Sequence, residues 1–173
     1  MPRRSSRRAR GEGQQGTPAL VALRRAGVAY TARPYDHDPA VRSYGAEAAE
    51  ALGVAPDRVF KTLVVDADGR LVVAVVAVGD HLEVKALAGV VGAKRATMAE
   101  PTAAERATGY VVGGISPLGG RQRLPTVVDR RALAHPTVFV SAGRRGLQVE
   151  LAPRDLVELC QAQVADIARS GDT

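Results

Sequence analysis

Two apolar runs separated by a short turn constrain the fold of this sequence more than any other feature. Residues 59–66 read VFKTLVVD, residues 67–69 read ADG, and residues 70–78 read RLVVAVVAV. Runs rich in β-branched residues on either side of an Asp-Gly turn are typical of an antiparallel hairpin. Because the second run is apolar without interruption, we expect it to be buried on both faces. Residues 59–78 therefore predict a hairpin in the interior of the fold.

Helical patterns lie before and after this hairpin. The first is the best marked, because Thr17 and Pro18 are suited to begin a helix and Gly27 to end it. The last opens at Pro153 and carries an apolar stripe at helical spacing as far as Ile167. The segments expected to be helical are 18–26, 45–52, 83–92, 100–109 and 153–167, and those expected to be strands besides the hairpin are 28–35, 94–99, 123–129, 137–143 and 147–152.

This alternation predicts a mixed α/β (α+β) fold. We expect a twisted, mixed, largely antiparallel and partly barrel-like sheet with helices packed outside it. Since aromatic residues make up only 3% of the chain, alanine, valine and leucine must fill the core. No linker composition interrupts residues 17–170, which predicts one domain over that range.

The positive charge is concentrated at the N-terminus. Residues 1–16 contain five arginines and one glutamate, a charge of +4, whereas the remaining 19 basic and 17 acidic residues amount to +2. The segment lacks apolar residues to bury, so we expect a disordered basic arm. It could bind phosphates, with affinity but little specificity, or be a solvated extension without a role.

Several function classes are disfavoured by composition. No apolar run reaches the roughly 20 residues of a membrane span, and no apolar signal segment opens the chain. The single cysteine, Cys160, lies in a helical pattern and fits a small core residue better than a nucleophile. The three histidines, His37, His81 and His135, lack the spacing of metal ligands. We therefore expect a cytoplasmic protein with no metal, no cofactor and no membrane contact.

A glycine-rich stretch at 107–120, ATGYVVGGISPLGG, has two interpretations. It places Gly113, Gly114, Gly119 and Gly120 within eight residues, together with a proline. It matches neither the Rossmann nor the P-loop pattern. The stretch is either an ordinary turn, or a segment whose backbone amides cradle a carbonyl or an oxyanion.

Lys61 is the second unusual feature, because it stands inside an otherwise apolar strand. Only three of the 24 basic residues are lysines, and arginine supplies the rest. By alternation Lys61 shares a face with Leu63, facing either the interior or a cleft. A buried lysine must be paired or change its pKa, whereas an edge lysine extends its amine to solvent. The pattern alone leaves both possibilities open.

Taken together, these segments resemble the bacterial YbaK/EbsC family, which is similar to the editing domain of prolyl-tRNA synthetases. The resemblance covers residues 17–169. It is carried by YDHDPA at 35–40, FKTL at 60–63, TGYVVGGISPLG at 108–119 and VSAGRRGLQVELAPRDL at 140–156. Ala142 stands where the family often has glycine, and Gln148 where some members have an acidic residue.

The resemblance implies the fold of that family and an enzyme, an aminoacyl-tRNA deacylase acting on mischarged Cys-tRNA(Pro) and also on Cys-tRNA(Cys). It implies that the cysteine thiol of the substrate attacks its own ester carbonyl. Aminoacylated tRNA is the implied partner, with prolyl-tRNA synthetase as a second candidate. The implied catalytic residues are Lys61, Gly113 and Gly114, and the implied substrate-binding residues are Tyr35, Tyr44, Thr62, Ser116, Pro117 and Ser141.

Three other functions stay open. The same scaffold could clear alanine or another amino acid from tRNA with water as the nucleophile. The chain could instead be a non-catalytic module that binds aminoacyl-tRNA or a synthetase. A general nucleic-acid binder is disfavoured, because the body of the chain has nearly balanced charge and few aromatic faces for stacking.

Overall fold

The hairpin predicted at 59–78 forms the centre of the protein. The structure, a computed structural model, describes residues 16–171. Strands β2 (Phe60–Ala67) and β3 (Arg70–Ala77) pair antiparallel, with Phe60 opposite Ala77 and Ala67 opposite Arg70. Asp68 and Gly69 adopt positive φ angles of 51° and 86°, as a tight hairpin turn requires. The hairpin is confirmed, and β3 is buried on both faces from Val72 to Ala77.

The hairpin belongs to a five-stranded mixed sheet. Its strand order is β5-β2-β3-β6-β9, with β2 antiparallel to both neighbours and β6 parallel to β3 and β9. The three further strands are β5 (Ala96–Met98), β6 (Thr126–Asp129) and β9 (Gln163–Ala165).

A three-stranded antiparallel sheet lies beside the first. Its order is β1-β8-β7, and an isolated parallel bridge between Val59 and Phe139 joins it to the start of β2. A two-stranded pair, β10-β4, completes the strands. The predicted mixed, largely antiparallel arrangement of strands is confirmed. Within residues 16–171 the sheets stay open and do not close into a barrel. The strands are β1 (Tyr30–Pro34), β4 (Asp80–Leu82), β7 (Val138–Arg144), β8 (Leu147–Leu151) and β10 (Ala168–Ser170).

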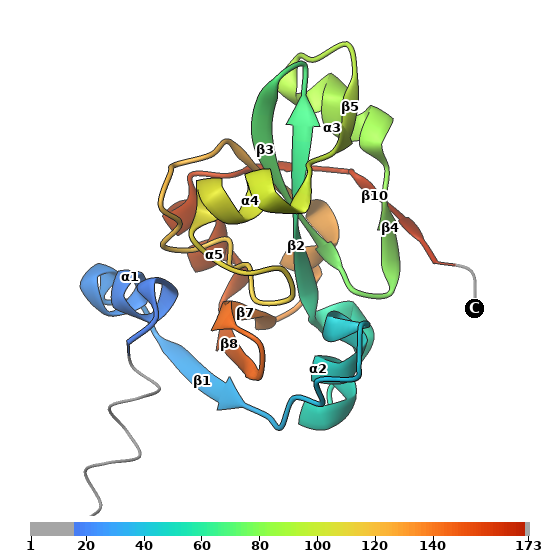
Figure 1. Cartoon of the computed structure of the whole chain (residues 1–173). Coiled ribbons are helices and arrows are strands. Elements are labelled where there is room, and N and C mark those ends of the chain that lie inside the picture. The colour runs from blue at the N-terminus through green and yellow to red at the C-terminus, as the bar shows by residue number, and fades with distance from the viewer. Residues whose placement is uncertain (1–15, 172–173) are drawn as a thin grey trace, which may run out of the picture.

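Within residues 16–171, five α-helices surround the sheets (Figure 1). The hairpin crosses the middle of the molecule, with α3 and β5 near one end and α2 near the other. As predicted, the Thr17 hydroxyl accepts a hydrogen bond from the Leu20 N–H, and Gly27 ends α1 in a left-handed conformation. The helices are α1 (Pro18–Ala26), α2 (Tyr44–Leu52), α3 (Val84–Val91), α4 (Pro101–Thr108) and α5 (Pro153–Cys160), with short 3-10 turns at Pro56–Arg58 and Arg130–Ala134.

The hairpin separates two apolar clusters. Phe60, Val73 and Val75 pack into the larger one, with α1, α5 and the three-stranded sheet. Val65, Val72 and Val76 pack on the opposite face with Leu87 of α3. As the composition predicted, most of the core side chains are alanine, valine and leucine.

The predicted final helix is too long. Helix α5 ends at Cys160, because Gln161 adopts a left-handed conformation with a φ of 49°. The chain then turns back into β9 and β10, and Ile167 lies between them. Leu156 is buried in the larger cluster and Ile167 in the other, so the apolar stripe does not belong to one helix face.

The basic arm at 1–16 lies, apart from Gly16, outside the described residues, and both it and the single domain at 17–170 stay predictions. Within residues 16–171, no helix is long and apolar enough to span a membrane.

Candidate active site

A pocket of about 570 Å³ lies along β2, within the size range of small-molecule sites. Its walls come from the chain entering α2, the start of α4, the glycine-rich loop and the paired strands β7 and β8. The lining residues are 42–46, 59–64, Val78, Met98, Ala99, Pro101, Ala104, Val112, Gly113, Ile115, Ser141 and Gln148. No cysteine, histidine, aspartate or glutamate is among these lining residues.

The structure brings five of the nine residues singled out from the sequence to this pocket. They are Tyr44, Lys61, Thr62, Gly113 and Ser141. Ser116 and Pro117 instead line a second cavity, of about 250 Å³. Gly114 and Tyr35 line neither cavity.

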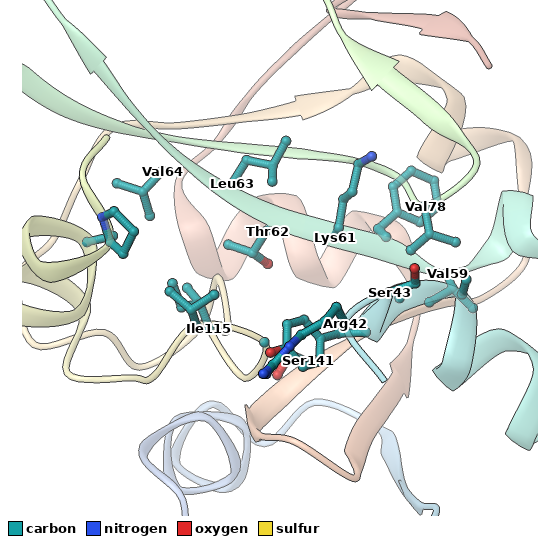
Figure 2. Close-up of a pocket in the computed structure, with 18 of the residues that line it drawn as sticks. Arg42, Ser43, Val59, Lys61, Thr62, Leu63, Val64, Val78, Ile115 and Ser141 are labelled. Carbon is teal, nitrogen blue, oxygen red and sulfur yellow. The ribbon is translucent and has the colours of Figure 1, made fainter. Parts of the chain in front are cut away.

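Lys61 and Thr62 leave β2 on opposite faces, as adjacent strand residues do. Figure 2 shows Thr62 directed toward Ile115 and Ser141, whereas the Lys61 amine points the other way. The Lys61 Nζ donates a hydrogen bond to the backbone oxygen of Asp80, at 2.7 Å. Burial lowers the pKa of Lys61, and the Asp80 carboxylate partly opposes that shift. Lys61 is therefore a partly buried, anchored amine in the pocket wall.

Two buried polar atoms of the lining residues have no hydrogen-bond partner among residues 16–171. They are the Thr62 hydroxyl oxygen and the Gln148 side-chain carbonyl oxygen. Ser141 lies directly opposite Gln148 across β7 and β8, and its hydroxyl accepts a hydrogen bond from the Gly143 N–H at 3.2 Å. Unpaired buried polar atoms are costly, so a ligand that pairs with them gains affinity and specificity.

Tyr35 stands next to this polar group, although it does not line the pocket. Its backbone N–H donates to the Gly146 carbonyl at 2.9 Å. Burial raises the pKa of the Tyr35 hydroxyl, and its hydrogen bond with the Gln148 side chain acts in the opposite direction. Tyr35 therefore holds the Gln148 side chain in place from outside the pocket.

Of the amides of Val112, Gly113 and Gly114 in the glycine-rich loop, only one is free. The Gly114 N–H is occupied, because it donates to the Val111 carbonyl at 2.9 Å. The Val112 N–H donates to the Glu105 carboxylate at 3.0 Å. Within the described chain the Gly113 N–H has no acceptor, and Gly113 adopts a φ of +88° that favours glycine. Of the two amides predicted to bind a carbonyl, only that of Gly113 is unoccupied.

The rest of the stretch serves packing. A Cβ on Gly119 would collide with the Pro18 backbone, so glycine lets this loop contact α1. The Tyr110 hydroxyl donates to the Leu118 carbonyl at 2.6 Å, and burial raises its pKa to about 12. The packing interpretation therefore holds for Gly119, whereas Gly113 stays the candidate for binding a carbonyl.

Cys160 lies at the second cavity. Its thiol donates a weak hydrogen bond to the Pro117 carbonyl at 3.3 Å, and burial raises its pKa to about 12. A thiol with this pKa is protonated at neutral pH, as the prediction of a structural cysteine requires.

Arg145 is the residue that sequence reasoning missed. In the sequence Arg145 stands only between the strands expected at 137–143 and 147–152. In the structure its side chain contacts both the glycine-rich loop and Tyr44. No sequence pattern connects Arg145 with Val112, 33 residues earlier, because the contact depends on the tertiary fold.

Comparison with known proteins identifies the family to which this fold belongs. Residues 38–159 match the aminoacyl-tRNA editing domain family. The chain belongs to this family. The predicted family and the prediction of an aminoacyl-tRNA deacylase are thus confirmed at the level of the family.

Relatives of the editing domain agree with this assignment. EbsC of Enterococcus faecalis, provisionally named a Cys-tRNA(Pro)/Cys-tRNA(Cys) deacylase, is 41% identical over 120 residues, 69% of this chain and 73% of its own length. A proline–tRNA ligase of Acidithiobacillus ferrooxidans is 32% identical over 136 residues, 78% of this chain but 24% of the ligase. The match covers only part of that enzyme.

Solved structures share the fold of the editing domain. The crystal structure of a provisionally named trans-editing enzyme for prolyl-tRNA synthetase superposes with a TM-score of 0.74 at 24% identity. It covers 92% of this chain and 94% of that one. The hypothetical protein APE2540 gives a TM-score of 0.80 at 27% identity, covering 88% of this chain and 99% of that one.

Proposed function

We propose that this protein hydrolyses mischarged Cys-tRNA(Pro), and Cys-tRNA(Cys) as well, with the substrate thiol as the nucleophile. One observation supports the mechanism more than any other. The lining of the pocket contains an amine and a free main-chain N–H, but no thiol, imidazole or carboxylate that could attack or activate a nucleophile. A hydroxyl such as that of Ser141 would need an adjacent base to become reactive.

The cysteinyl group supplies what this pocket lacks. Its thiolate attacks its own ester carbonyl carbon, forming a carbon–sulfur bond. The bond between that carbon and the terminal ribose oxygen then breaks, and the oxygen takes up the proton that the thiol released. The products are deacylated tRNA and a cyclic thioester, which water opens to cysteine. Serine and alanine have no thiol to attack in this way.

In this mechanism the protein positions the ester and stabilises charge. The Gly113 N–H donates to the carbonyl oxygen as it becomes an oxyanion. Lys61 contributes positive charge at the same pocket, where partial burial strengthens electrostatic interactions. The substrate polar groups pair with the unpartnered oxygens of Thr62 and Gln148, beside Ser141.

The remaining predicted residues act indirectly. Tyr44 borders the pocket, and Tyr35 supports Gln148 from outside. The hydrogen bond of the Gly114 N–H closes the turn that presents Gly113. Ser116 and Pro117 belong to the part of the loop that lines the second cavity. These placements favour support of the loop over contact with substrate.

Prolyl-tRNA synthetase is the proposed source of the mischarged substrate. Cysteine and proline are similar in volume, and pockets that differ by a methylene discriminate by only about 1–3 kcal/mol. An editing step that requires a thiol discriminates by chemistry instead. The similarity to part of a proline–tRNA ligase supports this partner.

A deacylation panel tests the proposal. Purified protein is incubated with tRNA(Pro) charged with cysteine, alanine or serine, with and without prolyl-tRNA synthetase. The proposal predicts rapid loss of cysteine and slow loss of the other two. Equal clearance of alanine would indicate a water-dependent deacylase, and tight binding without turnover a regulatory module.

A further inference from the structure

Arg145, at the turn between β7 and β8, binds the glycine-rich loop through a single acceptor. Its Nε and Nη2 donate to the Val112 carbonyl oxygen, at 2.9 and 2.6 Å. Hydrogen bonds from a charged donor are stronger than neutral ones. Two of them on one oxygen fix that peptide group in space.

The carbonyl that Arg145 binds belongs to the same peptide group as the Gly113 N–H. The described peptide bonds are all trans, so the C=O and N–H of this group point in opposite directions. Val112 and Gly113 line the pocket, whereas Arg145 does not. With its oxygen held by Arg145, the peptide group turns its N–H away from that side chain.

The neighbouring amides are held by other partners. Glu105 binds the Val112 N–H and Val111 binds the Gly114 N–H, which leaves the Gly113 N–H as the free donor of these three. Drawing electrons toward the carbonyl oxygen makes the N–H of the same amide more positive, as in any hydrogen-bonded chain of amides.

One further contact restrains the guanidinium. It lies over the Tyr44 ring at 4.8 Å, a cation–π distance. A Cβ on Gly113 would approach the Arg145 Nε to 2.8 Å and the Tyr44 ring to 3.0 Å, so only glycine admits both neighbours. Among residues 16–171, no carboxylate forms an ion pair with Arg145, so no neighbouring carboxylate offsets its charge at this peptide.

We infer that Arg145 is a positioning residue, which orients and polarises the Val112–Gly113 peptide so that the Gly113 N–H becomes a stronger oxyanion donor. The inference rests on the proposed function, because it concerns the same reaction. Tyr44 has a corresponding role: its ring holds the guanidinium in place.

The test compares Arg145→Met, Arg145→Lys and the matched control Arg144→Met. Arg144 is exposed and carries the same charge one residue away, so its replacement removes the same net charge without touching the Val112 carbonyl. Three quantities are measured: the single-turnover rate on Cys-tRNA(Pro), the affinity for an amide-linked, non-hydrolysable analogue, and the NMR shift of the Gly113 amide proton in free protein.

We expect Arg145→Met to lower the single-turnover rate about 10-fold or more, since removing an oxyanion donor outright costs roughly 100-fold or more. Affinity for the analogue should change no more than in Arg144→Met. The Gly113 amide proton should move upfield, Arg145→Lys should restore part of the rate, and added guanidinium ion should partly rescue Arg145→Met.

Other results would overturn the inference. An Arg145→Met protein with the wild-type rate, or an unchanged Gly113 shift in a folded variant, would show that the guanidinium does not act on this amide. A rate loss explained by weaker analogue binding would do the same. These outcomes leave the proposed function standing, whereas a wild-type protein that clears no Cys-tRNA removes the proposed function itself.

Discussion

The amine of Lys61 donates a hydrogen bond to the backbone carbonyl of Asp80, 2.7 Å away at the start of β4. The Asp80 carboxylate in turn accepts a hydrogen bond from Arg131, also at 2.7 Å. The amine of this pocket-lining lysine is thus tied to a neighbouring strand. This anchoring fixes where its charge lies while leaving two of its three N–H donors for other partners.

Replacing Lys61 by alanine should reduce deacylation at least about 100-fold with little loss of stability. The variant loses a positive charge at the pocket, but it also removes the cost of burying that charge. Single-turnover deacylation and thermal unfolding measure the two effects. Lys85→Ala, which changes an exposed lysine on α3, is the control. A Lys61→Ala protein with wild-type activity would refute the assignment of Lys61.

The negative charge of Asp80 should influence the pKa of Lys61. Burial lowers the pKa of Lys61 and Asp80 raises it, so Asp80→Asn should lower the pKa further. NMR of the lysine side chains measures this directly, because the chain has only three lysines, and Lys85 and Lys94 provide reference signals. If the pKa of Lys61 were the same in Asp80→Asn as in the wild-type protein, Asp80 would not act on the amine.

The same shift has a consequence for stability. Between the lowered pKa of folded Lys61 and the ordinary value of 10.5, the unfolded chain binds more protons than the folded chain. Across that window the contribution of Lys61 to stability rises with pH. Asp80→Asn widens the window toward lower pH, which denaturant unfolding at several alkaline pH values would detect.

Gly113→Ala should impair both the loop and the reaction. Its φ of +88° costs an alanine about 1–3 kcal/mol, and the new Cβ would contact Arg145 and Tyr44. Deacylation should fall at least tenfold. Gly89→Ala in α3 is the matched control, because a Cβ there meets nothing within 4 Å, and it should stabilise the protein by about 0.5–1 kcal/mol. Full activity in Gly113→Ala would place the loop outside the site.

Cys160→Ser should leave deacylation within about twofold of wild type. The thiol lies at the second cavity, and its pKa of about 12 keeps it protonated. Folded protein should accordingly react slowly with thiol reagents, and denatured protein quickly. A large loss of activity in Cys160→Ser would point to an enzyme thiol in the reaction.

The sequence predicted the elements whose signals are local. Thr17 and Gly27 mark the ends of α1, and Asp68-Gly69 marks the hairpin turn, because caps and tight turns depend on a few adjacent residues. The path after Cys160 was missed, because Gln161 carries no turn signal and β9 and β10 depend on pairing with β6 and β4. Strands of three residues are stabilised by their neighbours in the sheet.

The site shows the same division. The resemblance to the family brought Lys61, Thr62 and Gly113 to attention, and the fold places all three at one pocket. The role of Arg145 could not be found that way, because it acts through a carbonyl, and any residue at position 112 supplies one. Gly113 and Gly114 are equivalent in the sequence, but in the structure the Gly114 N–H already donates a hydrogen bond to the Val111 carbonyl.

The central claim is that the attacking sulfur comes from the substrate. The most direct measurement compares Cys-tRNA(Pro) with tRNA(Pro) charged with 2-aminobutyrate, in which a methyl group replaces the thiol. Intramolecular attack is lost in the analogue, so the enzyme should cleave it at least about 100-fold more slowly. Cleavage of both substrates at similar rates would contradict the account.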